Sequence, residues 1–347
     1  MKNLPANKIK DLKEFSREER REIFRALGEP AYREKQLHRW ILSGAESLSD
    51  MTDIPLGLRE TLACRYAFCS LTIERQQVDP KDGTRKFLLK LPDNNTVEAV
   101  FMKYNYGNTL CVSTQVGCAM GCRFCASGIG GRVRNLAPWE MLYQYTVCRT
   151  AAGEPIGHVV LMGMGEPFDN YDAVSAFLRM LHEPDGIGMS YRNMTVSTCG
   201  VVPGILQFAQ DFSQSNLAVS LHATSQEERL ALMPVARKWP LQELLNACRD
   251  YVDATGRRIT FEYALITGEN DSDERALKLA DLLKGMLCHV NIIPLNPVRD
   301  TGLTGSTRNR VTRFASILEA KGIPATVRRQ LGSDIDAACG QLRRKFV

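Results

Sequence analysis

The sequence predicts an α/β fold in which a partial or complete β/α barrel follows a small helical domain and a β-hairpin. Seven β-rich runs recur from about residue 108, with helical stretches between them. These runs are apolar and nearly unalternating, which is typical of parallel strands covered by helices. Polar residues and cysteines follow the ends of several runs, and that end of a β/α barrel carries the active site. A doubly wound sheet would use fewer of these loops.

Residues 1–75 are expected to form the helical domain. Ser16 precedes the segment REERREIFRAL, which ends at Gly28 and Pro30, and the segment YREKQLHRWIL ends near Gly44. Serine favours helix starts, and glycine or proline marks helix ends. With lysine and arginine on their outer faces, these helices either cap the larger domain or contact a nucleic acid.

The remaining elements follow in order. Residues 76–107 are predicted to form a β-hairpin that turns around Asp93, Asn94 and Asn95, because alternating strands flank these turn residues. Residues 108–330 are predicted to form the barrel, and residues 331–347 a flexible loop with a basic tail. The barrel strands are expected in TLCVSTQ, GHVVLMG, NMTVSTC, NLAVSLH, RITFEYALI, CHVNIIPL and PATVRRQ.

Composition places the chain among ordinary globular proteins. It has 347 residues, of which 44% are hydrophobic and 24% are charged. The net charge of +5 permits nucleic-acid binding without requiring it. No apolar run reaches the length of a membrane span, and the first residues are polar and lysine-rich. We therefore expect a cytoplasmic protein that does not interact with membranes.

Four of the eleven cysteines fall between residues 111 and 125. Cys118, Cys122 and Cys125 have the C-x3-C-x2-C spacing, which suits an iron–sulfur cluster and leaves one iron of a [4Fe–4S] cluster open for a ligand. Zinc is disfavoured because no second metal-binding pair follows, and a disulfide is disfavoured in a reducing compartment. Four other cysteines lie in apolar segments and are expected to be buried: Cys64, Cys148, Cys248 and Cys288.

The C-x3-C-x2-C loop resembles the signature of the radical S-adenosylmethionine (SAM) superfamily, with Phe124 at the position of its usual aromatic residue. The resemblance implies a partial (β/α)6-type radical-SAM barrel, a [4Fe–4S] cluster whose open iron is chelated by SAM, and cleavage of SAM to a 5′-deoxyadenosyl radical. The segment GMGEP resembles the family's glycine-rich SAM-binding segment, with Gly165 and Glu166 as its SAM-binding residues. By itself, a glycine pair also fits a simple strand-to-helix turn.

Further motifs, in order from about residue 28 to residue 342, resemble the RlmN family of adenine C2-methyltransferases, which act on 23S ribosomal RNA and on transfer RNA. They are GEPAYREKQLHRWI, CVSTQVGCAMGCRFC, VVLMGMGEP, STCGVVP, SLHA, FEYALI, CHVNIIPLNPV and VRRQLGSDIDAACGQL. The segment CASGIGGRVRNL departs from the family pattern around positions 127 and 132. The last motif also partly resembles the Cfr family, which methylates adenosine C8 of 23S ribosomal RNA, so C8 methylation is the alternative.

The RlmN resemblance implies roles for individual residues. Cys339 accepts a methyl group from one of two SAM molecules used per turnover, and Cys111 later forms a transient disulfide with it. Glu98 is the general base. The implied SAM contacts, besides Gly165 and Glu166, are Ser197, Ser220, Leu221, His222 and Asn296. Without the resemblance, Cys339 fits a small core residue, Glu98 a solvent-facing strand residue and His222 a hydrogen-bonded residue at a barrel end.

The expected partners are 23S ribosomal RNA, transfer RNA and an electron donor such as flavodoxin or ferredoxin. Candidate phosphate contacts are Arg328, Arg329, the basic residues 343–345 and the N-terminal helices. Two other functions stay open. A radical-SAM reaction on a small molecule or peptide has no need of both Cys111 and Cys339, and an iron–sulfur redox sensor has no need of the segments GMGEP, SLHA and PLNP.

Overall fold

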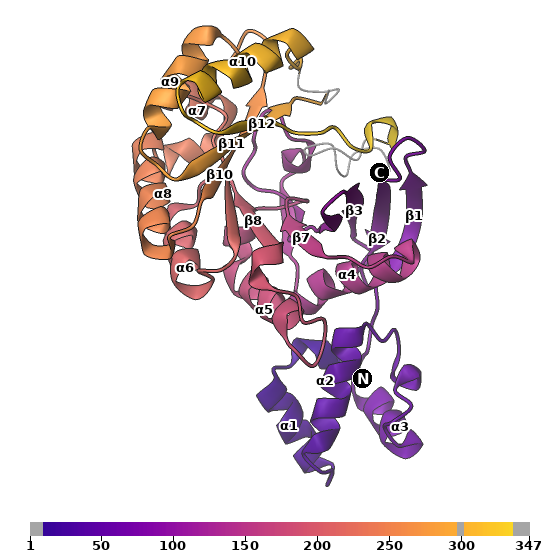
Figure 1. Ribbon diagram of the computed structural model, residues 1–347. Coiled ribbons are helices and arrows are strands. Elements are labelled where there is room, and N and C mark those ends of the chain that lie inside the picture. Colours follow the sequence, from indigo (N-terminus) through magenta and orange to yellow (C-terminus); the bar gives the residue numbers. More distant parts are fainter. Residues whose placement is uncertain (1–9, 297–301, 336–347) are drawn as a thin grey trace, which may run out of the picture.

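The structure is a computed structural model of the chain, and it describes residues 10–296 and 302–335. Within these ranges a helical N-terminal module precedes one ten-stranded sheet and its covering helices (Figure 1). The strand order is β1-β2-β3-β4-β7-β8-β9-β10-β11-β12. The sheet therefore follows the order of the chain, with the small β5–β6 sheet apart from it.

Local sequence signals fix the helices of the N-terminal module. Helix α1 (Arg17–Ala26) begins at Ser16, which exchanges hydrogen bonds with Glu19 in a capping box. Helix α2 (Tyr32–Ser43) ends at Gly44, whose φ of 86° suits glycine. Helix α3 (Leu56–Arg65) completes the module, with the 3-10 turns Leu12–Glu14 and Leu48–Asp50 beside it. Both predicted helices are confirmed.

An antiparallel meander joins the helical module to the barrel. Its strands are β1 (Thr72–Val78), β2 (Arg85–Lys90), β3 (Thr96–Tyr104) and β4 (Gly107–Cys111). β2 and β3 form the predicted hairpin. The sequence did not predict β1, because six of its seven residues are exposed and a polar edge strand has no apolar alternation. The domain boundaries at residues 75, 107 and 330 stay predictions.

Within the described residues the barrel part contains seven parallel strands, and each predicted run overlaps one of them. They are β4, β7 (His158–Leu161), β8 (Met194–Thr198), β9 (Asn216–Ser220), β10 (Ile259–Leu265), β11 (Cys288–Pro294) and β12 (Ala325–Val327). Because β1 and β12 are the two edges of the sheet, the barrel is partial. The connecting helices are α4 (Pro138–Ala152), α5 (Tyr171–His182), α6 (Val202–Asp211), α7 (Gln226–Leu232), α8 (Leu241–Thr255), α9 (Asp273–Leu283) and α10 (Arg308–Ala320).

The barrel strands alternate more than the sequence suggested. In β8, Val196 is buried under the helices while Thr195 is partly exposed, and β11 repeats this pattern with Val290 and Asn291. The inward polar residues line a cavity inside the barrel. Apolar residues therefore dominate only the helix-covered face of each strand.

The predicted burial of four cysteines is mostly confirmed. Cys148, Cys248 and Cys288 are buried, but Cys64 is exposed. It lies on the solvent side of α3, whose Leu62 carries the buried contact. No helix in the described part of the chain has the length and apolar character needed to span a membrane.

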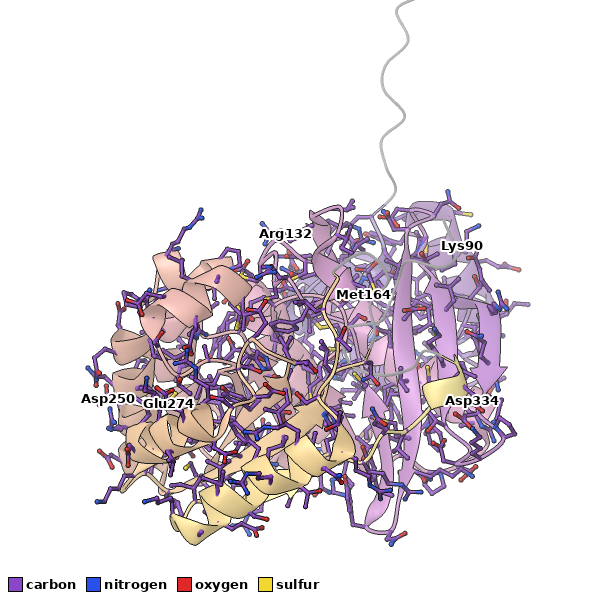
Figure 2. The ribbon with its side chains drawn as sticks, turned by 90° about the horizontal axis from the view of Figure 1, so that it is seen from above. Lys90, Arg132, Met164, Asp250, Glu274 and Asp334 are labelled. Atoms are coloured by element: carbon purple, nitrogen blue, oxygen red, sulfur yellow. The ribbon has the colours of Figure 1, made fainter. Side chains whose placement is uncertain are left out.

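The C-terminal segment, residues 328–335, crosses from β12 to the β1–β2 turn, which lies at the opposite edge of the sheet. The Gly332 N–H donates to Asp82 Oδ2 at 2.9 Å, and Lys81 Nζ lies 2.9 Å from Asp334 Oδ2. Figure 2 shows Asp334 beside the meander strands. Ile335, the last described residue, is buried. This segment bridges the open side of the partial barrel.

Candidate active site at the C-terminal ends of the parallel strands

A cavity lies at the C-terminal ends of the parallel strands. Its lining includes nine of the predicted site residues, which come from the cysteine loop (residues 118–125) and from the segments at the ends of β7, β8, β9 and β11: Cys118, Cys122, Cys125, Gly165, Glu166, Ser197, Ser220, His222 and Asn296. The topology brings these segments together because parallel strands end at one face of the barrel. Three other predicted residues, Leu221, Glu98 and Cys111, are outside this lining.

Hydrogen bonds on two sides hold the cysteine loop. Strands β5 (Gln115–Gly117) and β6 (Arg132–Asn135) frame it, and the Cys118 N–H donates to the Gly131 carbonyl at 3.2 Å. On the other side the Arg123 N–H donates to the Leu232 carbonyl at 3.0 Å, at the end of α7. The three cysteines are therefore presented from a loop that is fixed by its neighbours.

The three thiols fit a cluster better than a single metal ion. Burial, with the nearby Cys125, raises the pKa of Cys118 to about 12, and burial raises the pKa of Cys122 as well. A bound metal would deprotonate such thiols. Within residues 10–296 and 302–335, no three His, Cys, Asp or Glu side chains are placed to hold one ion. A [4Fe–4S] cluster has four irons for its thiolates, so its ligands need not converge on one point as zinc ligands do.

The glycines of GMGEP allow two loops to pack backbone against backbone. A Cβ at Gly163 would lie 2.6 Å from the Val112 carbonyl oxygen, and one at Gly165 would lie 2.7 Å from Gln115 Cβ. The φ of Gly165 is 109°, a conformation that favours glycine. The family resemblance implies that Gly165 binds SAM, but the close contacts of both glycines in the structure are with the chain itself. Both glycines also line the cavity.

Glu166 is a buried carboxylate held by backbone donors. Its Oε1 accepts from the Phe168 N–H at 3.0 Å and its Oε2 from the Cys199 N–H at 2.7 Å. Burial raises its pKa, while these hydrogen bonds act in the opposite direction. Glu166 therefore lines the cavity as a carboxylate that the protein itself holds in place.

His222 is a neutral barrel-end histidine. Its Nδ1 accepts from the Ala264 N–H at 2.9 Å, and its ring packs edge-on against Phe124 with 4.6 Å between centroids. Burial lowers its pKa to about 3, with a smaller contribution from Arg229. The neighbouring Leu221 is buried and donates its N–H to the Glu262 carbonyl. His222 is therefore the hydrogen-bonded barrel-end residue that is expected without the family resemblance, and it also lines the cavity.

Glu98 and Cys111 lie on neighbouring strands of the meander. Val100 pairs with Cys111 in the β3–β4 ladder, which makes Glu98 a diagonal neighbour of Cys111 on the same face. That face points into the barrel, because Thr109 and Met102 on the same two strands line the inner cavity. Glu98 is buried, not solvent-facing, and its carboxylate lies 3.6 Å from Lys86 Nζ.

The C-terminal residues are only partly placed. Cys339 and the basic residues 343–345 lie outside the described residues. Arg329 is exposed, whereas the Arg328 guanidinium lies 3.7 Å from the Glu262 carboxylate and lines the cavity. Arg328 therefore lies at the cavity beside a buried carboxylate, and its role as a phosphate contact stays a prediction.

Sequence reasoning missed Glu262 and Cys199 in the cavity lining. Glu262 is buried, and Asn291 Nδ2 donates to both of its carboxylate oxygens at 3.2 and 2.9 Å. Burial raises its pKa. A carboxylate within the apolar run FEYALI was a signal that could have identified Glu262. Cys199 had no such signal, because small residues commonly follow a strand.

Comparison with known proteins agrees with this geometry. Residues 112–280 match the family model of the Radical SAM superfamily, and residues 10–67 match the ribosomal RNA large subunit methyltransferase N-terminal domain. The chain is 50% identical over 338 residues to a probable dual-specificity RNA methyltransferase RlmN of Thermoanaerobacter sp. (strain X514), covering 97% of this chain and 98% of that protein. A protein of the same name from Caldanaerobacter subterraneus is 51% identical, with the same coverage of both chains.

A solved structure is also similar over nearly the whole chain. The crystal structure of a radical SAM methyltransferase from Sphaerobacter thermophilus has a TM-score of 0.91 and 46% identity, and covers 96% of this chain and 99% of that chain. The fold is therefore a radical-SAM fold, and its cofactors are a [4Fe–4S] cluster and SAM. Full-length identity of this degree shows that the chain belongs to the RlmN family of radical-SAM RNA methyltransferases.

Proposed function

We propose that the chain methylates C2 of adenosine in 23S ribosomal RNA and in transfer RNA, through an S-methylcysteine at Cys339 and a transient Cys111–Cys339 disulfide. The observation that carries this proposal is the position of Glu98 and Cys111 on one inward face of the meander. The C-terminal segment is anchored at the turn that leads into the same meander. The name that the relatives share, dual-specificity RNA methyltransferase, supports two kinds of RNA substrate.

The cavity residues would hold the two cofactors. Cys118, Cys122 and Cys125 would ligate the cluster, and the remaining lining residues would bind SAM: Gly165, Glu166, Ser197, Ser220, His222 and Asn296, with Leu221 beside them. When bound, the cluster and two SAM molecules per turnover supply the methyl group and the radical chemistry. Because adenine C2 is electron-poor, it cannot attack a methyl sulfonium directly, so a protein thiol must carry the carbon.

Cys339 and Cys111 would have different roles in the reaction. Cys339 carries the carbon to the base, and the product is then joined to its sulfur. The Cys111 thiolate attacks that sulfur, so that the S–S bond forms and the S–C bond breaks. The electron pair leaves on carbon, which takes up a proton and becomes the methyl group. Cys339 follows Ile335 by four positions, a reach of about 14 Å at most.

Glu98 would take the proton from C2 before the S–C bond breaks. Its buried position beside Cys111 supports this role better than a solvent-facing one. Basic residues would bind the RNA phosphates. The candidates are Arg329 and the basic residues of the N-terminal helices. The reaction would take place in the cytoplasm, with a flavodoxin or ferredoxin as electron donor.

The test combines product analysis with cysteine variants. Wild-type protein, Cys111→Ala and Cys339→Ala are reconstituted anaerobically and given labelled SAM and RNA from a strain that lacks the activity. Wild-type protein is expected to yield 2-methyladenosine. Cys339→Ala is expected to yield no methylated adenosine, and Cys111→Ala to accumulate protein joined to RNA. Cys248→Ala, which removes a buried cysteine far from the meander strands, serves as the control.

Two results would contradict the proposal. Full turnover by Cys339→Ala would remove the thiol carrier from the mechanism. A product identified by mass analysis as 8-methyladenosine would place this chain with C8 methylation instead.

A further inference from the structure

A buried guanidinium lies behind the wall of the candidate active site. Arg229, on α7, is fully buried. Its Nη2 donates to the Cys199 carbonyl oxygen at 2.6 Å and to the Ser220 carbonyl oxygen at 3.2 Å. Its Nε and Nη1 have no hydrogen-bond partner within the described residues. Arg229 is therefore held by two neutral acceptors, with two donor nitrogens unsatisfied.

Burial of the Arg229 guanidinium costs free energy unless an anion lies nearby. An arginine side chain stays charged in proteins, and removing a charge from water costs several kcal/mol unless the charge is paired. The two buried carboxylates of the site have other partners: Glu166 accepts backbone hydrogen bonds from Phe168 and Cys199, and Glu262 accepts from Asn291 Nδ2. Among the described residues no carboxylate forms an ion pair with Arg229. A negatively charged group bound at the site would supply the compensating charge.

The cysteine loop is the neighbour of this charge. The loop rests on the end of α7, where the Arg123 N–H donates to the Leu232 carbonyl at 3.0 Å. The two residues whose carbonyls hold the guanidinium, Cys199 and Ser220, also line the cavity with the three predicted cluster ligands. The backbone of Cys199 and Ser220 therefore separates the Arg229 guanidinium from the cavity that holds the three cysteines.

Gly200 leaves space for the Arg229 side chain. A Cβ at position 200 would lie 2.9 Å from Arg229 Nη2, and Gly200 has a φ of 106°. The glycine after Cys199 therefore leaves room for the guanidinium to reach the strand-end carbonyls. A shorter cation at position 229 would leave part of this space empty.

We propose that Arg229 is the buried counter-cation of the iron–sulfur cluster and raises its reduction potential. Three thiolates make the cluster site anionic, and reduction adds one more negative charge. A fixed positive charge in a low-dielectric surrounding stabilises the reduced form more than the oxidised form. Arg229 thereby makes the electron transfer that starts turnover more favourable. This inference does not depend on which adenosine carbon is methylated.

The test is a redox titration of the reconstituted full chain without RNA, followed by electron paramagnetic resonance. Arg229→Gln is expected to shift the cluster midpoint to a more negative potential, whereas Arg229→Lys is expected to remain close to wild type. Arg21→Gln removes an equal charge from the N-terminal module and is expected to leave the midpoint unchanged. If Arg229 only bridges two carbonyls, Arg229→Gln lowers the melting temperature without moving the midpoint, and the proposal is overturned.

A second measurement applies if Arg229→Gln retains no cluster. The melting temperatures of the cluster-free wild type and variant are then compared. The proposal predicts that the cluster-free variant is at least as stable as the cluster-free wild type, because the substitution removes an unpaired buried charge. A cluster-free variant that melts well below the wild type would assign Arg229 a purely structural role and overturn the proposal.

Discussion

The residue at position 165 must be small, because it packs against Gln115, the first residue of β5. We predict that Gly165→Ala destabilises the fold by about 2–4 kcal/mol, because its Cβ would overlap Gln115 and its φ of 109° is unfavourable for alanine. The melting temperature and cluster content should both fall. Gly57→Ala is the control, since nothing lies within 4 Å of that position in α3. Equal melting temperatures for the two variants would contradict this account.

The chemistry of individual site residues was readable from the sequence, but their surroundings were not. The spacing of Cys118, Cys122 and Cys125 predicted that they are cluster ligands, and the structure places all three in the lining of one cavity. Glu98 could equally have faced solvent, because burial in a meander depends on which strand pairs beside it. Arg229 gave no signal, since an arginine in the segment QEERLAL is indistinguishable from a solvated helix residue.

Arg134 ties three elements together at the frame of the cysteine loop. From β6 it donates to Asp93 Oδ2 in the β2–β3 turn at 2.6 Å, and to both oxygens of Glu140 in α4 at 2.7 and 2.8 Å. We predict that Arg134→Ala loosens β6 and speeds loss of the cluster in air, as measured by its visible absorbance. Glu74→Gln, which removes an exposed ion pair on β1, should leave that rate unchanged. If Arg134→Ala loses its cluster in air at the wild-type rate, Arg134 does not have this role.

The same contacts make a pH prediction. Arg134 and Asn95 outweigh partial burial and lower the pKa of Asp93 to about 2, from an ordinary value of 3.8. A carboxylate with a lowered pKa stabilises the fold above pH 3.8, and this stabilisation is lost as the pH falls toward 2. In Arg134→Ala the pKa of Asp93, measured by NMR titration, should return toward 3.8. A pKa that stays near 2 would show that Arg134 is not responsible.

At the level of elements, hydrophobic runs and turn residues predicted all seven barrel strands and the hairpin. They failed for β1, whose polar residues pair only along one edge. They also missed that Thr195 and Asn291 face an inner cavity, because an inward polar residue and a solvent-facing residue have the same pattern in the sequence.

The C-terminal segment closes the open side of the partial barrel. We predict that Asp82→Ala, which removes the acceptor of the Gly332 N–H, slows methylation of Cys339 about fivefold, the equivalent of about 1 kcal/mol. The rate is measured by mass spectrometry with labelled SAM. Lys81→Ala removes only an exposed ion pair and should have little effect. Equal rates for Asp82→Ala and wild type would show that this anchor does not guide Cys339.

The whole-molecule arrangement was the least predictable part. The sequence suggested a separate hairpin and a separate tail, yet β3 pairs with the first barrel strand and the tail returns to the β1–β2 turn. The contact between Gly332 and Asp82 joins residues 250 positions apart, and no local pattern encodes it. It brings the segment that leads to Cys339 toward the strands that carry Glu98 and Cys111.

The most direct test of this account is mass analysis of the protein quenched during a single turnover under non-reducing conditions. We predict that a peptide pair linked through Cys111 and Cys339 appears in proportion to methylated adenosine and disappears on reduction. Methylated adenosine formed at full yield without any such linkage would contradict the central claim that these two thiols meet.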